Sequence, residues 1–369
     1  MPWQWPWRRT EDRALFNVGN VPMATSWAGE PVTVETAMRL STVFGCVRLL
    51  ADSVSTLPLA VYRGDDRDPI PTPPLLQRPS ADHPELSDWL WACMASLLLR
   101  GNCWGWISSR VGAGLLPAQV DLLHPDSVSV QEQRDAPPVI RVDGTEVDRA
   151  DLFHCKAFPL PGSIEGLSPI AYARESIGLG RGAERYGATL FRDAAIPSGV
   201  LTSDQRINKE QATALKERWK VAHQNKRDIA VLGDGARFQA ITIKPEEAQF
   251  IETQKFNVAT ICRFYGIDPT MMAGETAGHM AYTSPEQRGT DFLVYSVRPW
   301  LVRLERAVSG LLPRNQTAKF NAGAFVRATL LDRYQAHKVG IEAGFLTVNE
   351  ARELEDRPPL PAPAPGGVA

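Results

Sequence analysis

Three small residues offer the first candidate chemistry in this 369-residue chain. Gly178, Gly180 and Ala183 match G-x-G-x-x-A, a pattern that binds dinucleotides when a strand leads into it and a helix N-terminus follows. Here the three residues fall inside a predicted helix that starts about ten residues earlier, so a pyrophosphate would not meet a helix N-terminus. The pattern therefore favours helix packing over cofactor binding.

A second candidate is a metal site built from His83, His154 and Cys155. Neighbouring residues on a strand point to opposite faces, so positions 154 and 155 are poorly placed to hold one ion. No histidine lies in a known nucleophile setting, and the adjacent Glu246 and Glu247 point about 100° apart on a helix. The sequence also lacks P-loop, H-E-x-x-H and G-x-S-x-G motifs. We therefore predict no enzyme activity, no cofactor and no metal.

The charge balance bears on binding of nucleic acid, and the cysteine spacing bears on the redox state of the thiols. The chain carries 40 basic and 42 acidic residues, and its net charge of -2 is too balanced for tight binding of nucleic acid over the whole surface. Any contact with DNA should be weak and local. The five cysteines are widely spaced without Cys-x-x-Cys, which is typical of reduced, buried thiols in a cytoplasmic protein.

The termini and hydropathy predict a protein without a membrane span. No apolar run approaches the ~20 residues that cross a bilayer. The start, Met1–Arg9, has three tryptophans and two helix-breaking prolines, and it lacks the apolar core of a signal peptide. Its indoles either dock on a neighbouring subunit, the reading we prefer, or seek a membrane interface.

The spacing of apolar residues divides the predicted helices and strands into an N-terminal part and a C-terminal part. The N-terminal part is mixed α and β, with helices at 34–57 and 84–100 and short strands between turns up to residue 165. From Gly166 the pattern becomes helical. The predicted helices run from Ser168 to Arg192, from 245 to 265, from 285 to about 312 with a kink at Pro299, from 331 to 343 and from 349 to 355.

The helix that ends at Arg192 is unusually rich in glycine. Each helical glycine costs about 1 kcal/mol relative to alanine, so a close approach of another helix should compensate. We expect copies of the chain to pack together there. The glycines concerned are Gly178, Gly180, Gly182 and Gly187.

Residues 268–284 lie between the predicted helices at 245–265 and 285–312 and contain no apolar period. Glycine and alanine alternate there with short polar side chains that suit weak, exchangeable contacts to a duplex. An ordinary surface loop is the other reading of the same stretch. The candidate DNA-facing residues are Gly274, Glu275, Thr276, Gly278, His279, Met280, Tyr282 and Thr283.

The order of these elements resembles the portal proteins of lambda-like, long-tailed bacteriophages. Seven local strings carry the resemblance across about 34–359, and no single one is specific. Asp268, where the family usually has an apolar residue, and the Trp-rich start depart from the family pattern. The strings are Val43–Tyr62, Gly101–Trp104, Gly166–Pro169, Pro197–Leu201, Phe264–Pro269, Val297–Trp300, and Gly344 followed by Thr347, Asn349, Glu350 and Arg352.

The resemblance implies an α+β portal fold. Its expected parts are a flexible arm (1–33), a mixed α/β wing (34–165), a first stem helix (166–192), a clip (193–244), a second, antiparallel stem helix (245–267), a tunnel loop (268–284), a kinked wing helix and strand (285–330), crown helices (331–356) and a disordered tail (357–369). In a weaker alternative, 208–222 is the first stem helix. Candidate clip residues that face terminase or an adaptor are Asp228, Asp234 and Arg237.

The implied function is a ring-shaped channel at a capsid vertex for packaging, retaining and ejecting DNA. The implied partners are further copies in a dodecameric ring, double-stranded DNA held weakly, terminase, and the major capsid and head-completion proteins. The expected location is the virion, and the host cytoplasm during assembly. The alternatives are another structural head or adaptor protein and, third, an enzyme that acts on DNA or cell wall.

Overall fold

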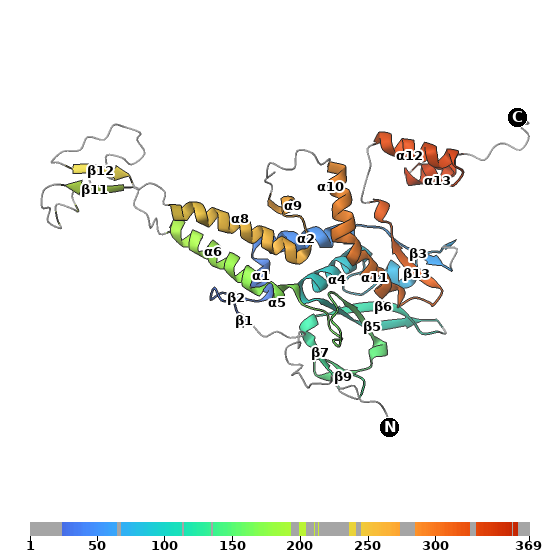
Figure 1. Cartoon of the computed structure of the whole chain (residues 1–369). Coiled ribbons are helices and arrows are strands. Elements are labelled where there is room, and N and C mark those ends of the chain that lie inside the picture. The colour runs from blue at the N-terminus through green and yellow to red at the C-terminus, as the bar shows by residue number, and fades with distance from the viewer. Residues whose placement is uncertain are drawn as a thin grey trace, which may run out of the picture.

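The computed structural model describes residues 24–64, 68–112, 114–133, 136–192, 199–203, 210, 213, 236–240, 245–273, 285–324, 330–355 and 357–360. Within these residues the protein is α+β, with helices packed beside small antiparallel sheets (Figure 1). This confirms the predicted fold class at the level of mixed helix and sheet.

The helices fall into an N-terminal and a C-terminal group. The first group is α1 (Val34–Met38), α2 (Ser41–Ser55), α3 (Pro74–Gln77) and α4 (Leu86–Arg100). The second is α5 (Pro169–Tyr172), α6 (Arg174–Arg192), α8 (Pro245–Tyr265), α9 (Thr270–Ala273), α10 (Pro285–Asp291), α11 (Arg298–Ser309), α12 (Leu330–Glu342) and α13 (Val348–Leu354).

The strands form two- and three-stranded antiparallel sheets. Their members are β1 (Ala24–Thr25) with β2 (Pro31–Val32); β13 (Gln316–Phe320) with β3 (Leu59–Arg63) and β4 (Asp68–Pro69); β10 (Leu152–Lys156) with β5 (Asn102–Val111) and β6 (Leu116–Leu123); β7 (Val128–Gln131) with β8 (Val139–Val142) and β9 (Thr145–Val147); and β11 (Gly199–Ser203) with β12 (Ala236–Ala240).

One large core lies around α2 and α4. On α2, Val43, Val47 and Leu50 recur at helical spacing and are fully buried, as the sequence period predicts. On α4, Trp89 is buried, and its indole N–H donates to the carbonyl of Val120 in β6 at 2.9 Å. The same core takes in α11 and the adjoining ends of α6 and α8, so it joins the wing to the base of the stem.

Two predicted long helices are each divided in the structure. The helix expected at 34–57 breaks at Arg39–Leu40, where Leu40 is extended between the end of α1 and the start of α2; a capping box of Thr33 and Thr36 marks the start of α1. The helix expected from Ser168 bends at Ala173 between α5 and α6, although the amide of Ile177 still donates to the carbonyl of Ala173 at 2.9 Å.

The predicted flexible arm is wrong at its C-terminal end. Strands β1 and β2 pair in an antiparallel hairpin, with Ala24 opposite Val32. Gly29, at φ +75°, makes the turn, and its amide donates to the carbonyl of Ser26 at 2.9 Å. The hairpin lies along α6 (Figure 1). Residues 1–23 lie outside the described part of the chain.

The irregularity predicted at Pro299 takes the form of a π-helical segment, η4 (Phe292–Val297), between α10 and α11. Proline has no N–H, and its ring crowds the carbonyl four residues earlier, here Tyr295. A wider turn relieves that crowding. It also leaves Tyr295 largely exposed, with 75% of its surface accessible.

Candidate stem and channel surfaces

Two of the strings that carry the family resemblance meet in space, 65 residues apart in the chain. The side chain of Asn102 accepts from the amide of Gly166 at 2.7 Å and donates to its carbonyl at 3.0 Å. Gly101 and Gly166 have no space for a side chain, because an added Cβ on either would overlap backbone atoms. Ser168 caps α5 and also donates to the carbonyl of Leu99 at 3.0 Å. These motif residues therefore fasten the wing to the start of the stem.

His154 is a structural residue of this junction. Its ring stacks on Trp104 with 3.6 Å between centroids, and its Nε2 lies 3.1 Å from Oδ1 of Asn102. Burial, helped by Arg149 and Lys156, lowers the pKa of His154 to about 3. The ring is therefore neutral at physiological pH. Among the described residues, no three His, Cys, Asp or Glu side chains gather as a metal site.

The helices predicted to form the stem correspond to α6 and α8, which lie side by side and run antiparallel (Figure 1). Gly180 of α6 sits directly against the side chain of Asn257 on α8, so a Cβ there would overlap it. Gly178 sits equally tightly against Ser26 of the β1–β2 hairpin. These two glycines thus let α8 and the hairpin approach α6 closely within one chain. The sequence predicts instead that they serve contacts between copies of the chain.

Gly182 is less constrained by its own chain than Gly178 and Gly180. A Cβ on Gly182 would have only ordinary contacts, the nearest being Ala28 at 3.8 Å. Gly187 is buried. Contact between copies at Gly182 or Gly187 stays a prediction.

Charged groups hold the hairpin on α6. Glu30 is buried at the end of the turn between β1 and β2. Its Oε1 lies 2.7 Å from Nη1 of Arg185, and its Oε2 lies 3.7 Å from Nη2 of Arg181. Arg181 also donates to the carbonyl of Thr36 at 2.6 Å, and the amide of Trp27 donates to Glu175 at 2.7 Å. The pairing of a buried carboxylate with two guanidinium groups fixes this hairpin in place.

The base of the candidate channel loop is well defined. Gly266, at φ +67°, ends α8, and the amide of Ile267 returns to the carbonyl of Cys262 at 3.0 Å. Asp268 then caps α9 by accepting from the amide of Thr270 at 2.9 Å and from its hydroxyl at 2.8 Å. Sequence reasoning missed α9, although an Asp followed by Pro269 is the usual start of a helix.

The segment that follows the candidate loop also contacts the end of α8. The hydroxyl of Ser296, in the π-helical segment, donates to the carbonyl of Gly266 at 2.5 Å. The end of α8 and the irregular turn before α11 are therefore joined directly. The predicted loop residues Gly274, Glu275, Thr276, Gly278, His279, Met280, Tyr282 and Thr283 lie outside the described residues.

The predicted clip is described in part. Strand β12 pairs with β11 in register, with Arg237 opposite Thr202, and the pair lies beyond the ends of α6 and α8 in Figure 1. Arg237 is thus on a strand, whereas Asp228 and Asp234 lie outside the described residues. So does most of the stretch at 208–222, the alternative first stem helix.

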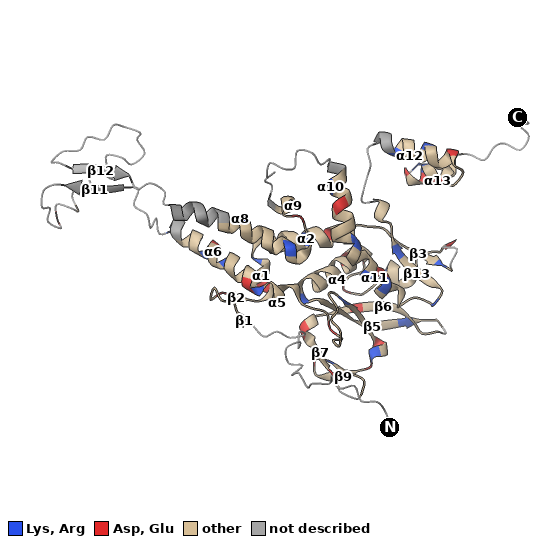
Figure 2. Cartoon of the chain, in the orientation of Figure 1, with Lys and Arg blue, Asp and Glu red and all other residues tan. Residues whose placement is uncertain are grey.

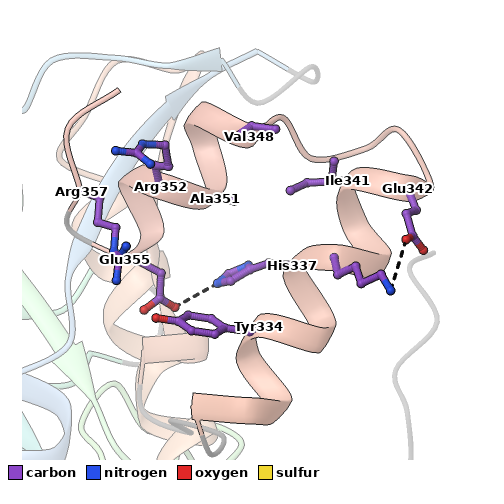
Figure 3. A pocket seen from close by; sticks show the side chains of 10 residues that line it. Tyr334, His337, Ile341, Glu342, Val348, Ala351, Arg352, Glu355 and Arg357 are labelled. Carbon is purple, nitrogen blue, oxygen red and sulfur yellow. Dashed lines mark hydrogen bonds and ion pairs between the residues drawn. The ribbon is translucent and has the colours of Figure 1, made fainter. Parts of the chain in front are cut away.

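The C-terminal helices α12 and α13 enclose an open groove of about 530 Å³ (Figure 3). Glu355 at its edge accepts from Arg333 at 2.8 Å and lies 3.0 Å from Nε2 of His337. The predicted capping box of Thr347 and Glu350 is confirmed at the start of α13. The groove carries no arrangement of groups that points to catalysis.

The five cysteines are all buried and unbridged, as predicted. Burial and a neighbouring thiol raise the pKa of Cys93, and burial raises that of Cys155 to about 12, so both stay protonated. Figure 2 shows that Lys and Arg alternate with Asp and Glu along the described helices and strands. None of the described helices is both long and apolar enough to cross a membrane.

Sequence comparison identifies the class of protein to which this mixed fold of helices and small sheets belongs. The sequence model of the family described as phage portal protein matches residues 41–356, so the chain belongs to the phage portal protein family. It is a structural family.

Similar proteins include named portal proteins. A probable portal protein of Streptomyces phage phiC31 is 33% identical, over 95% of this chain and 80% of its own length. The portal protein of Enterobacteria phage HK97 is 27% identical, over 89% of this chain and 81% of its own. A solved neck of a native GTA particle, computed with C12 symmetry, has a chain with TM-score 0.61 and 22% identity, covering 89% of this chain and 94% of that one.

Proposed function

We propose that this portal protein assembles into a closed ring whose central hole passes DNA at a capsid vertex of the virion. Membership of the phage portal family is the observation that carries the proposal. The similarity in fold to a chain in a C12-symmetric neck supports a ring of identical subunits.

In this ring, α6 and α8 form the stem, and β11–β12 belongs to the clip that faces terminase and head-completion proteins. The loop at 268–284, starting from the fixed base at Gly266 and Asp268, reaches into the channel. Its short polar residues, such as Thr276, His279 and Tyr282, guide the duplex through weak contacts, and the near-zero net charge suits sliding. The energy for translocation comes from a separate motor, since this sequence has no P-loop.

Imaging of the purified full chain tests the ring directly. We expect particles with a central hole, far larger than the 40.6 kDa monomer. A monomer at high concentration under several salt conditions would contradict the proposal.

Deletion of residues 275–281 tests the channel role separately. Because the loop base is held by Gly266, Asp268 and Ser296 outside the deleted stretch, rings should still form. DNA packaging or retention in an infection complementation assay should fall. Normal packaging by the deletion variant would show that the loop is an ordinary surface loop.

A further inference from the structure

Helix α6 has three distinct sides. Gly180 faces α8 on the first side, and Gly178 faces the β1–β2 hairpin on the second. On the third side lie Leu179 and Tyr186, seven residues apart and therefore on one stripe of the helix, and Tyr172 lies seven residues before Leu179 at the end of α5. The exposed fractions of Tyr172, Leu179 and Tyr186 are 51%, 44% and 61%, so a large apolar stripe of the stem faces outward.

Trp27, at the tip of the hairpin, is the second outward apolar feature, with 93% of its surface exposed. Its position is fixed from several directions. Its own amide is held by Glu175, the preceding Ser26 packs on Gly178, and Glu30 is clamped by two arginines of α6. A large indole on such a firmly held turn costs little conformational entropy to bind, so it is suited to anchoring a contact.

We infer that Trp27 of one copy packs on the part of the α6 stripe between Tyr172 and Leu179 of the next copy. The inference rests on the proposed ring. A cyclic ring uses head-to-tail contacts, in which two different surfaces of the same chain meet. The hairpin and the stripe lie on different sides of α6 and can form such a pair, while α8 covers the remaining side (Figure 1).

Symmetry also selects the level of the contact along the stem. Rotation about the ring axis leaves every atom at its own height, so Trp27 meets a neighbour at the height it has in its own chain. In the proposed ring α6 runs along the axis, so this height is that of Glu175, which accepts from the amide of Trp27 and lies between Tyr172 and Leu179 in the sequence. Tyr186 lies about 16 Å further along, at 1.5 Å per residue. It therefore provides a matched control on the same stripe.

Cysteine cross-linking between two single variants tests the pairing. Trp27→Cys protein is co-assembled with an equal amount of Leu179→Cys, Tyr172→Cys or Tyr186→Cys protein, and a short bis-maleimide is added. The five native cysteines are buried and should not react. We expect a cross-linked dimer with Leu179→Cys or Tyr172→Cys, at several times the yield obtained with Tyr186→Cys, and none with Trp27→Cys alone.

A second variant guards against misfolding. Because its indole is almost fully exposed, Trp27→Ala should keep the circular dichroism of the parent chain. It should need about ten-fold more protein to form rings, as expected for loss of an interface anchor.

The outcomes separate this inference from the proposed function. Rings that give no dimer, or equal dimer with Tyr186→Cys, would overturn the Trp27 contact and leave the ring intact. Unchanged ring formation by Trp27→Ala would also overturn it. Absence of rings from the parent protein would overturn both proposals.

Discussion

The core around α2 and α4 and the outer faces of α6, α8 and α12 differ in how far their apolar side chains are covered. In the wing, Val43 and Leu50 of α2 and Leu97 of α4 are fully buried within the chain. In the stem, Leu179 and Phe256 leave 44% and 61% of their surfaces exposed, and Val339 of α12 leaves 60%. The core around α2 and α4 is therefore closed within the chain, whereas the outer parts of α6, α8 and α12 carry apolar surface that a partner is expected to cover. The difference leads to four predictions.

The largest effect should come from the wing core. Trp89→Ala removes a buried indole, its hydrogen bond to Val120 and its contact with Phe153, whose ring centroid lies 5.6 Å away. We expect a loss of about 3–5 kcal/mol in the free energy of unfolding. Urea unfolding followed by circular dichroism measures it. A loss below about 1 kcal/mol would show that Trp89 is not part of a tightly packed core.

The junction of wing and stem should be sensitive to acid. The folded-state pKa of His154, about 3, lies below the ordinary value of 6.5. Stability from the neutral ring is therefore complete above pH 6.5 and is lost as the pH falls towards 3, by about 4 kcal/mol.

His154→Phe provides the comparison, because phenylalanine can still stack on Trp104 but does not titrate. It should lose about 1 kcal/mol at pH 7 with the hydrogen bond to Asn102. Its unfolding free energy should then vary less than that of the parent chain between pH 6.5 and 3. Parallel pH curves for the two proteins would show that His154 is not the titrating group.

Alanine substitution at two glycines of α6 should change the free energy of unfolding in opposite directions. At Gly178 the new Cβ meets Ser26, so the hairpin must shift and we expect a net loss of about 1–2 kcal/mol. At Gly182 there is space, so Gly182→Ala should gain about 0.5–1 kcal/mol from helix propensity. Thermal unfolding of both variants measures the difference. A loss of ring formation by Gly182→Ala with a stable chain would place a neighbouring copy at that position.

The smallest effect should come from the C-terminal helices. Val339→Ser on α12 should change the free energy of unfolding by less than about 0.5 kcal/mol, since the side chain is mostly in solvent. The matched change Val47→Ser on α2 buries a hydroxyl in a full core and should cost about 2–4 kcal/mol. Similar losses in both variants would mean that the two regions are not as different as their exposures indicate.

Much of this protein could be predicted from local sequence. The bounds of α8 agree with the helix predicted from 245 to 265, because apolar period and capping residues act over a few residues. The capping box of α13 and the glycine end of α4 at Gly101 follow for the same reason. The seven ordered strings were enough to identify the family, and the family model confirms it.

Only the tertiary structure decided what those local signals do together. The glycines of α6 signalled close packing, but the sequence could not say that Ser26 and Asn257 are the neighbours, since both contacts join distant parts of the chain. Likewise, the hairpin before residue 33 has too few apolar residues to show a period. It is ordered because Arg181 and Arg185, about 150 residues later, pair with Glu30. The preference of a segment for helix, strand or turn depends on neighbouring residues, whereas burial and ion pairing depend on which distant surfaces the fold brings together.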